Sequence, residues 1–221
     1  MIVKTKKKLK FMNHNFIAIE GNIGVGKTSL ARMISEDYNS KLILESFAEN
    51  PFLPKFYKDP EKYAFSLELF FMSERYHQLK NQWSGDLFLT NKVADYFFMK
   101  SKIFALNNLK SDELLLFDKL FEIMLSSLPL PDLLVYLHSD VPRLQENIHK
   151  RGREFELNIK DAYLKSIQNN YFDYLKKQDK IPVLIIDISS IDFINNENHY
   201  NKIKNLINEN YSVGDIKKVI L

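Results

Sequence analysis

Three of the six glycines in this chain of 221 residues lie within one short segment whose residue types suit phosphate binding. The segment Gly21-Asn-Ile-Gly-Val-Gly-Lys-Thr28 matches G-x-x-x-x-G-K-[ST] at every fixed position. Its glycines allow successive backbone N–H groups to curve around phosphate oxygens. Lys27 is placed to reach the β- and γ-phosphates, and Thr28 to ligate Mg²⁺. We therefore predict ATP as co-substrate, Mg²⁺ as cofactor with Thr28 as its ligand, and an ATP-binding set of Gly21, Asn22, Ile23, Gly24, Val25, Gly26, Lys27, Thr28 and Ser29.

A phosphate loop alone does not say whether the γ-phosphate is hydrolysed or passed to an acceptor. Guanine-specific switch proteins also need the motifs D-x-x-G and N-K-x-D. No aspartate in the chain is followed three residues later by glycine, and Asn91-Lys-Val-Ala-Asp95 is one residue too long for the second motif. Transfer to a small acceptor is therefore favoured.

The elements around the loop alternate between strands and helices. Strands are expected at Phe16–Glu20, Leu42–Leu44, Leu87–Val93, Pro131–Leu137 and Pro182–Asp187. Helices are expected over Lys27–Asp37, Glu61–Trp83, a segment ending at Ala105, Ser111–Leu128 with Ser111 as its cap, Val141–Lys150, Lys160–Lys177, and from about Glu197. This alternation predicts an α/β fold with a five-stranded parallel sheet flanked by helices.

Charge and composition restrict the partners. Of the 31 basic residues, five lie in residues 1–10, which leaves 26 against 28 acidic residues and a net charge of −2 for the rest. A nucleic-acid-binding domain needs a basic face, so no nucleic acid is expected. Without cysteine, and without an apolar run of the roughly 18 residues that span a bilayer, we expect a cytoplasmic protein with no membrane partner. Residues 1–15 are expected to be a disordered basic extension, or translation begins at Met12, and residues 16–221 form a single domain.

Glu45 follows the second expected strand, at the edge where ligands gather in open α/β sheets, and could accept a proton from an attacking hydroxyl. From Phe16 to about Phe193 the chain resembles the deoxynucleoside kinases, the family of the deoxycytidine, deoxyguanosine and deoxyadenosine kinases. The resemblance rests on the loop opening Gly-Asn-Ile-Gly and on the segments Leu44–Pro51, Tyr57–Phe65, Ile103–Ala105, Pro131–Leu137 and Lys150–Glu156. It implies a P-loop kinase with a short lid, a homodimer, and ATP-dependent phosphorylation of a deoxynucleoside 5′-hydroxyl in nucleotide salvage.

The resemblance also implies a role for each matching residue. Glu45 is the general base, while Arg151 and Arg153 are lid arginines that close over the transferring phosphate. The implied substrate-binding residues, besides Glu45, are the sugar-holding pair Tyr57 and Glu156, the base-stacking Phe104, Glu68 at the place of a base-reading glutamine, and Arg75 further along the same helix. An ionised glutamate only accepts hydrogen bonds, and guanine offers two adjacent donors, so a purine is slightly favoured.

Two departures from the family pattern bear on catalysis. The family carries an acidic residue followed by Arg-Ser at the end of the third strand, where this chain has Val93-Ala-Asp-Tyr-Phe97. Asp95 stands either at the arginine or, with one residue missing, at the acidic position; we favour a catalytic carboxylate near Mg²⁺-bound water, with Lys100 or the lid arginines supplying positive charge. Asn147 replaces the first lid arginine. A nucleoside monophosphate kinase or other small-acceptor kinase, and a nucleotide-binding regulatory protein with little turnover, remain alternatives.

Overall fold

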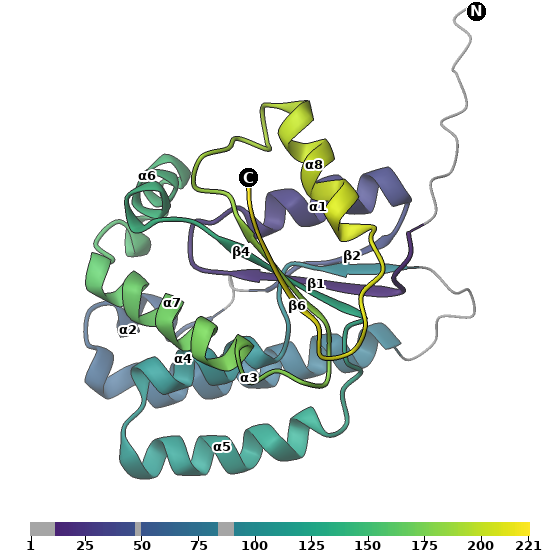
Figure 1. Cartoon of the computed structure of the whole chain (residues 1–221). Coiled ribbons are helices and arrows are strands. Elements are labelled where there is room, and N and C mark those ends of the chain that lie inside the picture. The colour runs from purple at the N-terminus through teal and green to yellow at the C-terminus, as the bar shows by residue number, and fades with distance from the viewer. Residues whose placement is uncertain (1–11, 47–49, 84–90) are drawn as a thin grey trace, which may run out of the picture.

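A computed structural model describes residues 12–46, 50–83 and 91–221 (Figure 1). Its centre is a sheet of six parallel strands in the order β2-β3-β1-β4-β5-β6. The strands are β1 (Phe16–Gly21), β2 (Lys41–Ile43), β3 (Lys92–Ala94), β4 (Leu133–His138), β5 (Val183–Asp187) and β6 (Ile216–Ile220).

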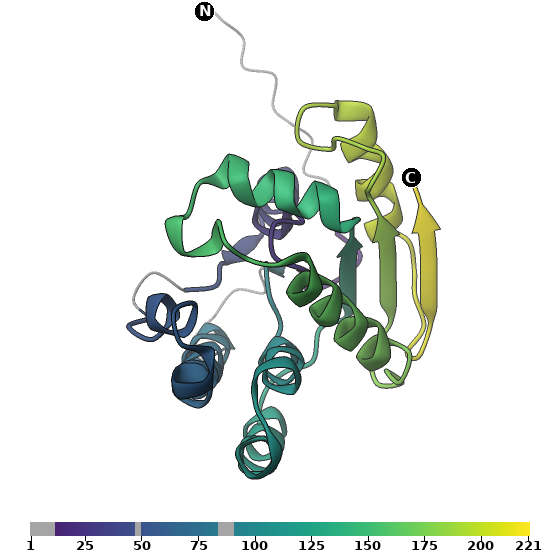
Figure 2. The same ribbon diagram turned by 90° about the vertical axis from the view of Figure 1, so that its left-hand side faces the viewer.

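Helices cover both faces of the sheet, because alternate residues of its central strands are apolar on either side. On β1, Ile17 and Ile19 face one core, while Phe16 and Ala18 face the other. The first core is closed by α1 (Lys27–Tyr38), α6 (Val141–Arg151) and α8 (Glu197–Ile207). The second is closed by α3 (Pro60–Trp83), α4 (Met99–Asn108), α5 (Ser111–Leu125) and α7 (Asp161–Leu175), as Figures 1 and 2 show.

The sheet has six strands, so the prediction of five was wrong. The missing strand is β6, which pairs in parallel with β5 at the edge of the sheet (yellow in Figure 2). Its sequence Ile-Lys-Lys-Val-Ile is half polar, and Ile216 and Ile220 are exposed. An edge strand has one strand neighbour and needs no continuous apolar run, so the signal used for the central strands did not find it.

The third strand and the fifth helix also differ from their predictions. The third strand is Lys92–Ala94, and residues 87–90 of the predicted Leu87–Val93 lie outside the described residues. The fifth helix ends at Leu125 rather than Leu128, and its cap position is Lys110, with no side-chain cap. Ser111 has a φ of 38°, so the predicted serine cap was wrong.

The carboxyl ends of β1, β2 and β3 meet at one edge of the sheet, where functional side chains collect. The short helix α2 (Leu53–Phe56) and the 3-10 turn η1 (Glu154–Glu156) complete the wall around that edge. Separately, none of the helices within the described ranges is long and apolar enough to cross a membrane.

Candidate active site

The phosphate loop joins β1 to α1, as its sequence predicted. Gly26 precedes α1 with a φ of 100°, a conformation that other residues rarely adopt, and a Cβ there would lie 3.1 Å from the ring of Phe193. The ammonium of Lys27 donates to the carbonyls of Gly21 (2.9 Å) and Asn22 (2.8 Å). Burial, reinforced by the charge of Lys100, lowers the pKa of Lys27 to about 7.

Two asparagines fix the loop against its neighbours. Asn22 donates to the carbonyl of Leu164 (2.8 Å), and Asn147 on α6 donates to the carbonyl of Gly24 (2.8 Å). Asn147, where the resemblance predicted the first lid arginine to be missing, therefore holds the loop backbone.

Asp95 connects the phosphate loop to the end of β2. Its Oδ2 accepts from the hydroxyl of Thr28 (2.5 Å), and its Oδ1 accepts from the backbone N–H of Glu45 (2.7 Å). The next residue, Tyr96, is fully buried and donates to Gln78 (2.6 Å). Asp95 thus lies beside Thr28, the predicted Mg²⁺ ligand.

Glu45 is held by two cations, one on each oxygen. Arg75 on α3 places Nε and Nη2 at 2.8 Å and 2.7 Å from Oε1, and Lys100 on α4 places Nζ at 2.5 Å from Oε2. Burial by itself would raise the pKa of Glu45, but the charges of Lys100 and Arg75 outweigh it and lower the pKa to about 2. The carboxylate is therefore ionised and fixed in direction.

Sequence reasoning missed a buried carboxylate on β1. Glu20 is fully buried near the end of β1 and accepts hydrogen bonds from the backbone of Phe97 (2.7 Å) and the hydroxyl of Tyr171 (2.8 Å). Burial raises the pKa of Glu20. The only sequence signal was an acidic residue inside an apolar strand.

The far end of the cavity carries a second buried carboxylate, Glu68. Its Oε1 accepts from the amide of Asn108 (2.6 Å), while its buried Oε2 has no hydrogen-bond partner within the described structure. Burial raises the pKa of Glu68 to about 7, although Arg75 and Asn108 lower it. Phe104, one turn before Asn108 on α4, also lines the cavity. The cavity therefore contains an aromatic ring and a buried carboxylate oxygen, Oε2 of Glu68, that can accept a hydrogen bond from a ligand.

The lid residues form their own cluster. Arg151 pairs with Oε2 of Glu156, and Arg153 lies 3.2 Å from Oε1. Tyr57 stacks on Phe155 with ring centroids 6.0 Å apart, and burial followed by the charge of Glu156 raises the pKa of Tyr57. The lid arginines are thus held at the sugar-binding pair of the prediction.

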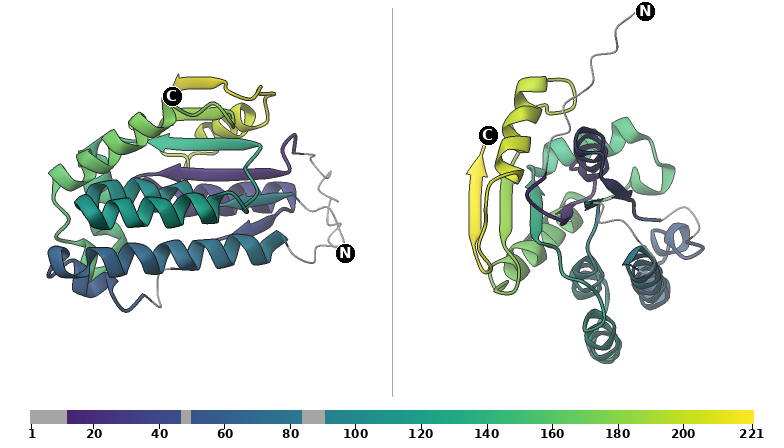
Figure 3. Two further views of the ribbon diagram at one scale, coloured as in Figure 1. Left: turned by 90° about the horizontal axis from the view of Figure 1, so that it is seen from below. Right: turned by 90° about the vertical axis from the view of Figure 1, so that its right-hand side faces the viewer.

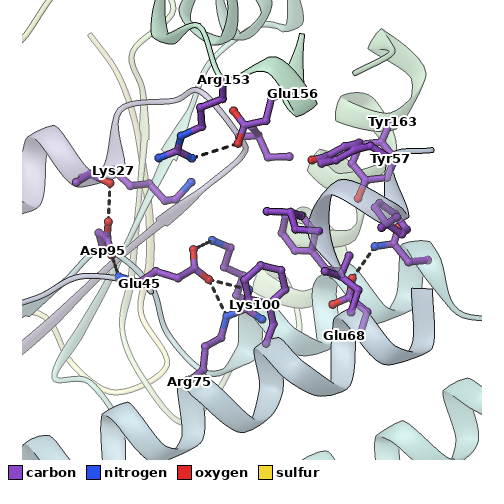
Figure 4. Close-up of a pocket in the computed structure, with 18 of the residues that line it drawn as sticks. Lys27, Glu45, Tyr57, Glu68, Arg75, Asp95, Lys100, Arg153, Glu156 and Tyr163 are labelled. Carbon is purple, nitrogen blue, oxygen red and sulfur yellow. Dashed lines mark hydrogen bonds and ion pairs between the residues drawn. The ribbon is translucent and has the colours of Figure 1, made fainter. Parts of the chain in front are cut away.

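A single cavity of about 120 Å³ brings these groups together (Figure 4). Every predicted catalytic and substrate-binding residue lines it, and Ile23, Lys27 and Thr28 of the phosphate loop reach it. Arg75, which was expected to bind substrate, contacts Glu45 and the hydroxyl of Ser101 (2.9 Å). Sequence reasoning missed Asn108 and Tyr163 in the wall; the helical spacing from Phe104 could have indicated Asn108, but nothing indicated Tyr163.

Comparisons with known proteins agree with this geometry. The family model described as "Deoxynucleoside kinase" matches residues 17–212. The chain is 36% identical over 195 residues to a deoxyguanosine kinase of Bacillus subtilis, covering 85% of this chain and 93% of that protein. It is 33% identical to a deoxyguanosine kinase of Lactobacillus acidophilus, covering 82% of this chain and 84% of that one.

A solved structure of deoxyadenosine kinase from M. mycoides with bound dATP has the same fold. It is 25% identical, with a TM-score of 0.75, and the match covers 88% of this chain and all of that one. Three observations agree. The parallel sheet carries a phosphate loop, one cavity is lined by residues of this loop and by the buried Glu68, and the family model matches most of the chain. The chain belongs to the deoxynucleoside kinase family, whose members transfer a phosphoryl group to a nucleoside hydroxyl.

Proposed function

We propose that this enzyme transfers the γ-phosphoryl group of ATP to the 5′-hydroxyl of a purine deoxynucleoside, with deoxyguanosine as the first candidate. One observation carries the proposal: the same cavity is lined by the phosphate-loop residues Lys27 and Thr28, by the ionised Glu45, and by Glu68, one oxygen of which has no partner among the described residues. The first three groups suit a phosphate donor and an attacking hydroxyl. Glu68 suits a base edge with hydrogen-bond donors.

In the proposed reaction, the 5′-oxygen forms a bond to the γ-phosphorus as the bond to the bridging oxygen of ADP breaks. The hydroxyl proton passes to Glu45. A carboxylate whose pKa is about 2 is a weak base, but phosphoryl transfer passes through a loose transition state in most analyses. The main task of Glu45 is therefore to orient the hydroxyl, and the proton leaves late.

The residues beside the loop fit Mg²⁺. This ion prefers oxygen ligands and is usually held by one or two carboxylates together with substrate phosphates. The hydroxyl of Thr28 and the carboxylate of Asp95, 2.5 Å apart, provide such donors. Thr28 would hold the ion, with Asp95 beside its water. When bound, Mg²⁺ neutralises charge on the phosphates.

The lid supplies further positive charge. Arg151 and Arg153 line the same cavity as Lys27 and Glu45. In the described state both contact Glu156, so we infer that they move to the transferring phosphate when the lid closes, which also excludes water. Tyr57 and Glu156 would then hold the sugar 3′-hydroxyl.

The part of the cavity around Glu68 favours a nucleobase that has hydrogen-bond donors along its edge. Guanine presents N1–H and a 2-amino group side by side, and the ionised Glu68 has one oxygen free to accept. Phe104 would stack on the base. The two relatives with identities of 36% and 33% are deoxyguanosine kinases, which supports the same choice.

A monophosphate acceptor is less well supported. Such a substrate needs free cations at the acceptor end, where the cavity has Glu68 and Phe104, and Arg75 is already paired with Glu45. A regulatory protein with little turnover is also less favoured, since a donor site and an acceptor site share one cavity.

The test is a panel of nucleosides and nucleoside monophosphates incubated with Mg·ATP, with ADP and product measured. We expect deoxynucleoside-dependent ADP, highest with deoxyguanosine. The variant Glu45→Gln should lower kcat by about 10²-fold or more, whereas Glu146→Gln, an exposed residue of α6, should not. A normal kcat in Glu45→Gln would exclude the proposed role of Glu45, and binding without turnover would favour the regulatory protein.

We also infer a homodimer formed through the outer surface of α5, the helix furthest from the sheet in Figure 3. Leu115, Leu116 and Ile123 are exposed by 59%, 49% and 69%. Spacings of seven and eight residues place them on one side of the helix. Apolar residues gathered in this way on a surface helix typically pack against another protein surface.

A further inference from the structure

The ion pair on Oε2 of Glu45 comes from Lys100, which the sequence suggested only as a possible source of positive charge. Lys100 is the second residue of α4 and is only 7% exposed, although it carries an ammonium group. Lysine is almost never buried to this degree unless it is paired. Its partner is Oε2 of Glu45 at 2.5 Å, and its Nζ lies over the ring of Phe104, 5.7 Å from the ring centroid.

Lys100 lies at the electrostatic centre of the site. After burial, its charge is the largest influence on the pKa of Glu20, of Lys27 and of Glu45. These residues come from β1, the phosphate loop and the end of β2. With Lys27 and Glu45, Lys100 lines the cavity where the donor phosphates and the acceptor hydroxyl would meet, so its pair with Glu45 is not peripheral.

The two residues that follow β3, Asp95 and Tyr96, carry no positive charge that could replace Lys100. The carboxylate of Asp95 accepts hydrogen bonds from Thr28 and from the backbone N–H of Glu45, and the hydroxyl of Tyr96 donates to Gln78. The positive charge next to Oε2 of Glu45 comes instead from Lys100, in the first turn of α4.

Arg75 and Lys100 restrain Glu45 in different ways. Arg75 uses two nitrogens on Oε1 while its other nitrogen bonds Ser101 and its guanidinium lies over Phe71, 4.8 Å from the ring centroid. Arg75 is therefore held by Glu45, Ser101 and Phe71, and it fixes the position of Oε1. Without a cation on Oε2, the carboxylate could turn about its last side-chain bond and move the oxygen that should receive the hydroxyl.

We propose that Lys100 is a positioning residue for the phosphoryl transfer: with Arg75 it forms a two-cation clamp that aims the free lone pair of Glu45 Oε2 at the attacking hydroxyl. The proposal rests on the role of Glu45 given above. Each carboxylate oxygen can accept two hydrogen bonds, so the contact with Lys100 leaves Oε2 able to accept a second one, from the hydroxyl. When the hydroxyl proton reaches Glu45, the clamp loses its anion, and the ammonium of Lys100 becomes free beside the new phosphate ester.

The test compares Lys100→Met, Lys100→Gln and Lys100→Arg with Lys102→Met. Lys102 lies two residues along α4 and pairs with Asp118 (3.5 Å) and Glu122 (3.3 Å) away from the cavity, which makes it the matched control. We expect Lys100→Met and Lys100→Gln to lower kcat by about 10²-fold, the loss that misplacement by about 1 Å can cause. KM for the deoxynucleoside and binding of ATP should change by less than about threefold, because substrate recognition lies with other residues. Lys100→Arg should regain at least about tenfold in kcat over Lys100→Met, because a cation returns to Oε2.

The effect must act through Glu45, and a double variant tests this. In a Glu45→Gln background there is no carboxylate to hold, so adding Lys100→Met should cost almost nothing more. An equal loss in both backgrounds, or a normal kcat in the folded Lys100 variants, would overturn the proposal. If Lys100→Met does not fold, as judged by circular dichroism, the same comparison is made with Lys100→Gln. Failure of the Glu45 role itself would be recognised separately, by normal turnover in Glu45→Gln alone.

Discussion

Replacing Glu68 with glutamine should make the protein more stable at neutral and alkaline pH, while weakening its preference for guanine. Burial raises the pKa of Glu68 from 4.5 to about 7, against the opposing effects of Arg75, Asn108 and Lys100. Below pH 4.5 the carboxyl is protonated in both folded and unfolded chains, so it has no effect. Between pH 4.5 and 7 the unfolded chain ionises first, and stability falls as pH rises. Above pH 7 the loss is complete.

The size of this loss follows from the pKa difference. At ~1.4 kcal/mol per pKa unit, a rise from 4.5 to about 7 lowers the free energy of unfolding by ~3 kcal/mol above pH 7. Glutamine does not ionise, and its carbonyl can still accept from Asn108. Because a chain of this size gains ~2–4 °C in Tm per kcal/mol, Glu68→Gln should melt up to ~6–12 °C higher at pH 8 and at nearly the same temperature at pH 4.5.

The assay is thermal and urea unfolding of both proteins across this pH range, with Glu74→Gln on the same helix as the control. The ratio of kcat/KM for deoxyguanosine to that for deoxyadenosine should fall by ~10–100-fold in Glu68→Gln, because a charged hydrogen bond contributes ~1.5–3 kcal/mol. In the wild type, the ratio of kcat/KM for deoxyguanosine to that for deoxyadenosine should rise with pH through about 7, and in the variant it should not. A stability difference that is the same at both pH values would refute the reasoning about burial, and an unchanged base ratio would refute the role in recognition.

Three further predictions concern other parts of the molecule. Asp95→Asn should raise the Mg²⁺ concentration for half-maximal rate by ~10–100-fold, as seen in a Mg²⁺ titration of turnover; an unchanged titration would separate Asp95 from the metal. Gly26→Ala should lower the free energy of unfolding by ~1–2 kcal/mol, because φ is 100° and Phe193 lies 3.1 Å from the new Cβ; equal urea midpoints would contradict this. Ile123→Asp should convert the proposed dimer to a monomer in size-exclusion chromatography, and an unshifted elution volume would place any interface elsewhere.

The sequence predicted those parts of the site that depend on local pattern. The phosphate loop and the residues Glu45, Glu68 and Phe104 were found because each lies in a motif or in a segment that resembles the family. What it could not predict were pairings across the fold. Arg75 and Lys100 are 25 residues apart and on different helices, and only tertiary packing decides that both contact Glu45. The same limit applies to Asn147, whose contact with Gly24 joins residues 123 positions apart.

The strands that are buried on both faces were predicted, whereas the edge strand β6 was missed. β4 and β5 are continuous apolar runs, whereas β6 has lysines in its centre and only one neighbouring strand. Periodicity reports burial, so it does not register a strand whose main stabilisation is backbone pairing at an edge.

The attachment of both lid arginines to Glu156 has a consequence for the wasteful hydrolysis of ATP. Water is a competing acceptor in every phosphoryl transfer, and the arginines would assist its attack as readily as that of a sugar hydroxyl. While Glu156 holds Arg151 and Arg153, ATP bound alone would lack this assistance. In the proposed function, a sugar hydroxyl that binds Glu156 would compete for the carboxylate and release the two side chains. The carboxylate proposed to bind the acceptor would thereby also keep the enzyme from consuming ATP in its absence.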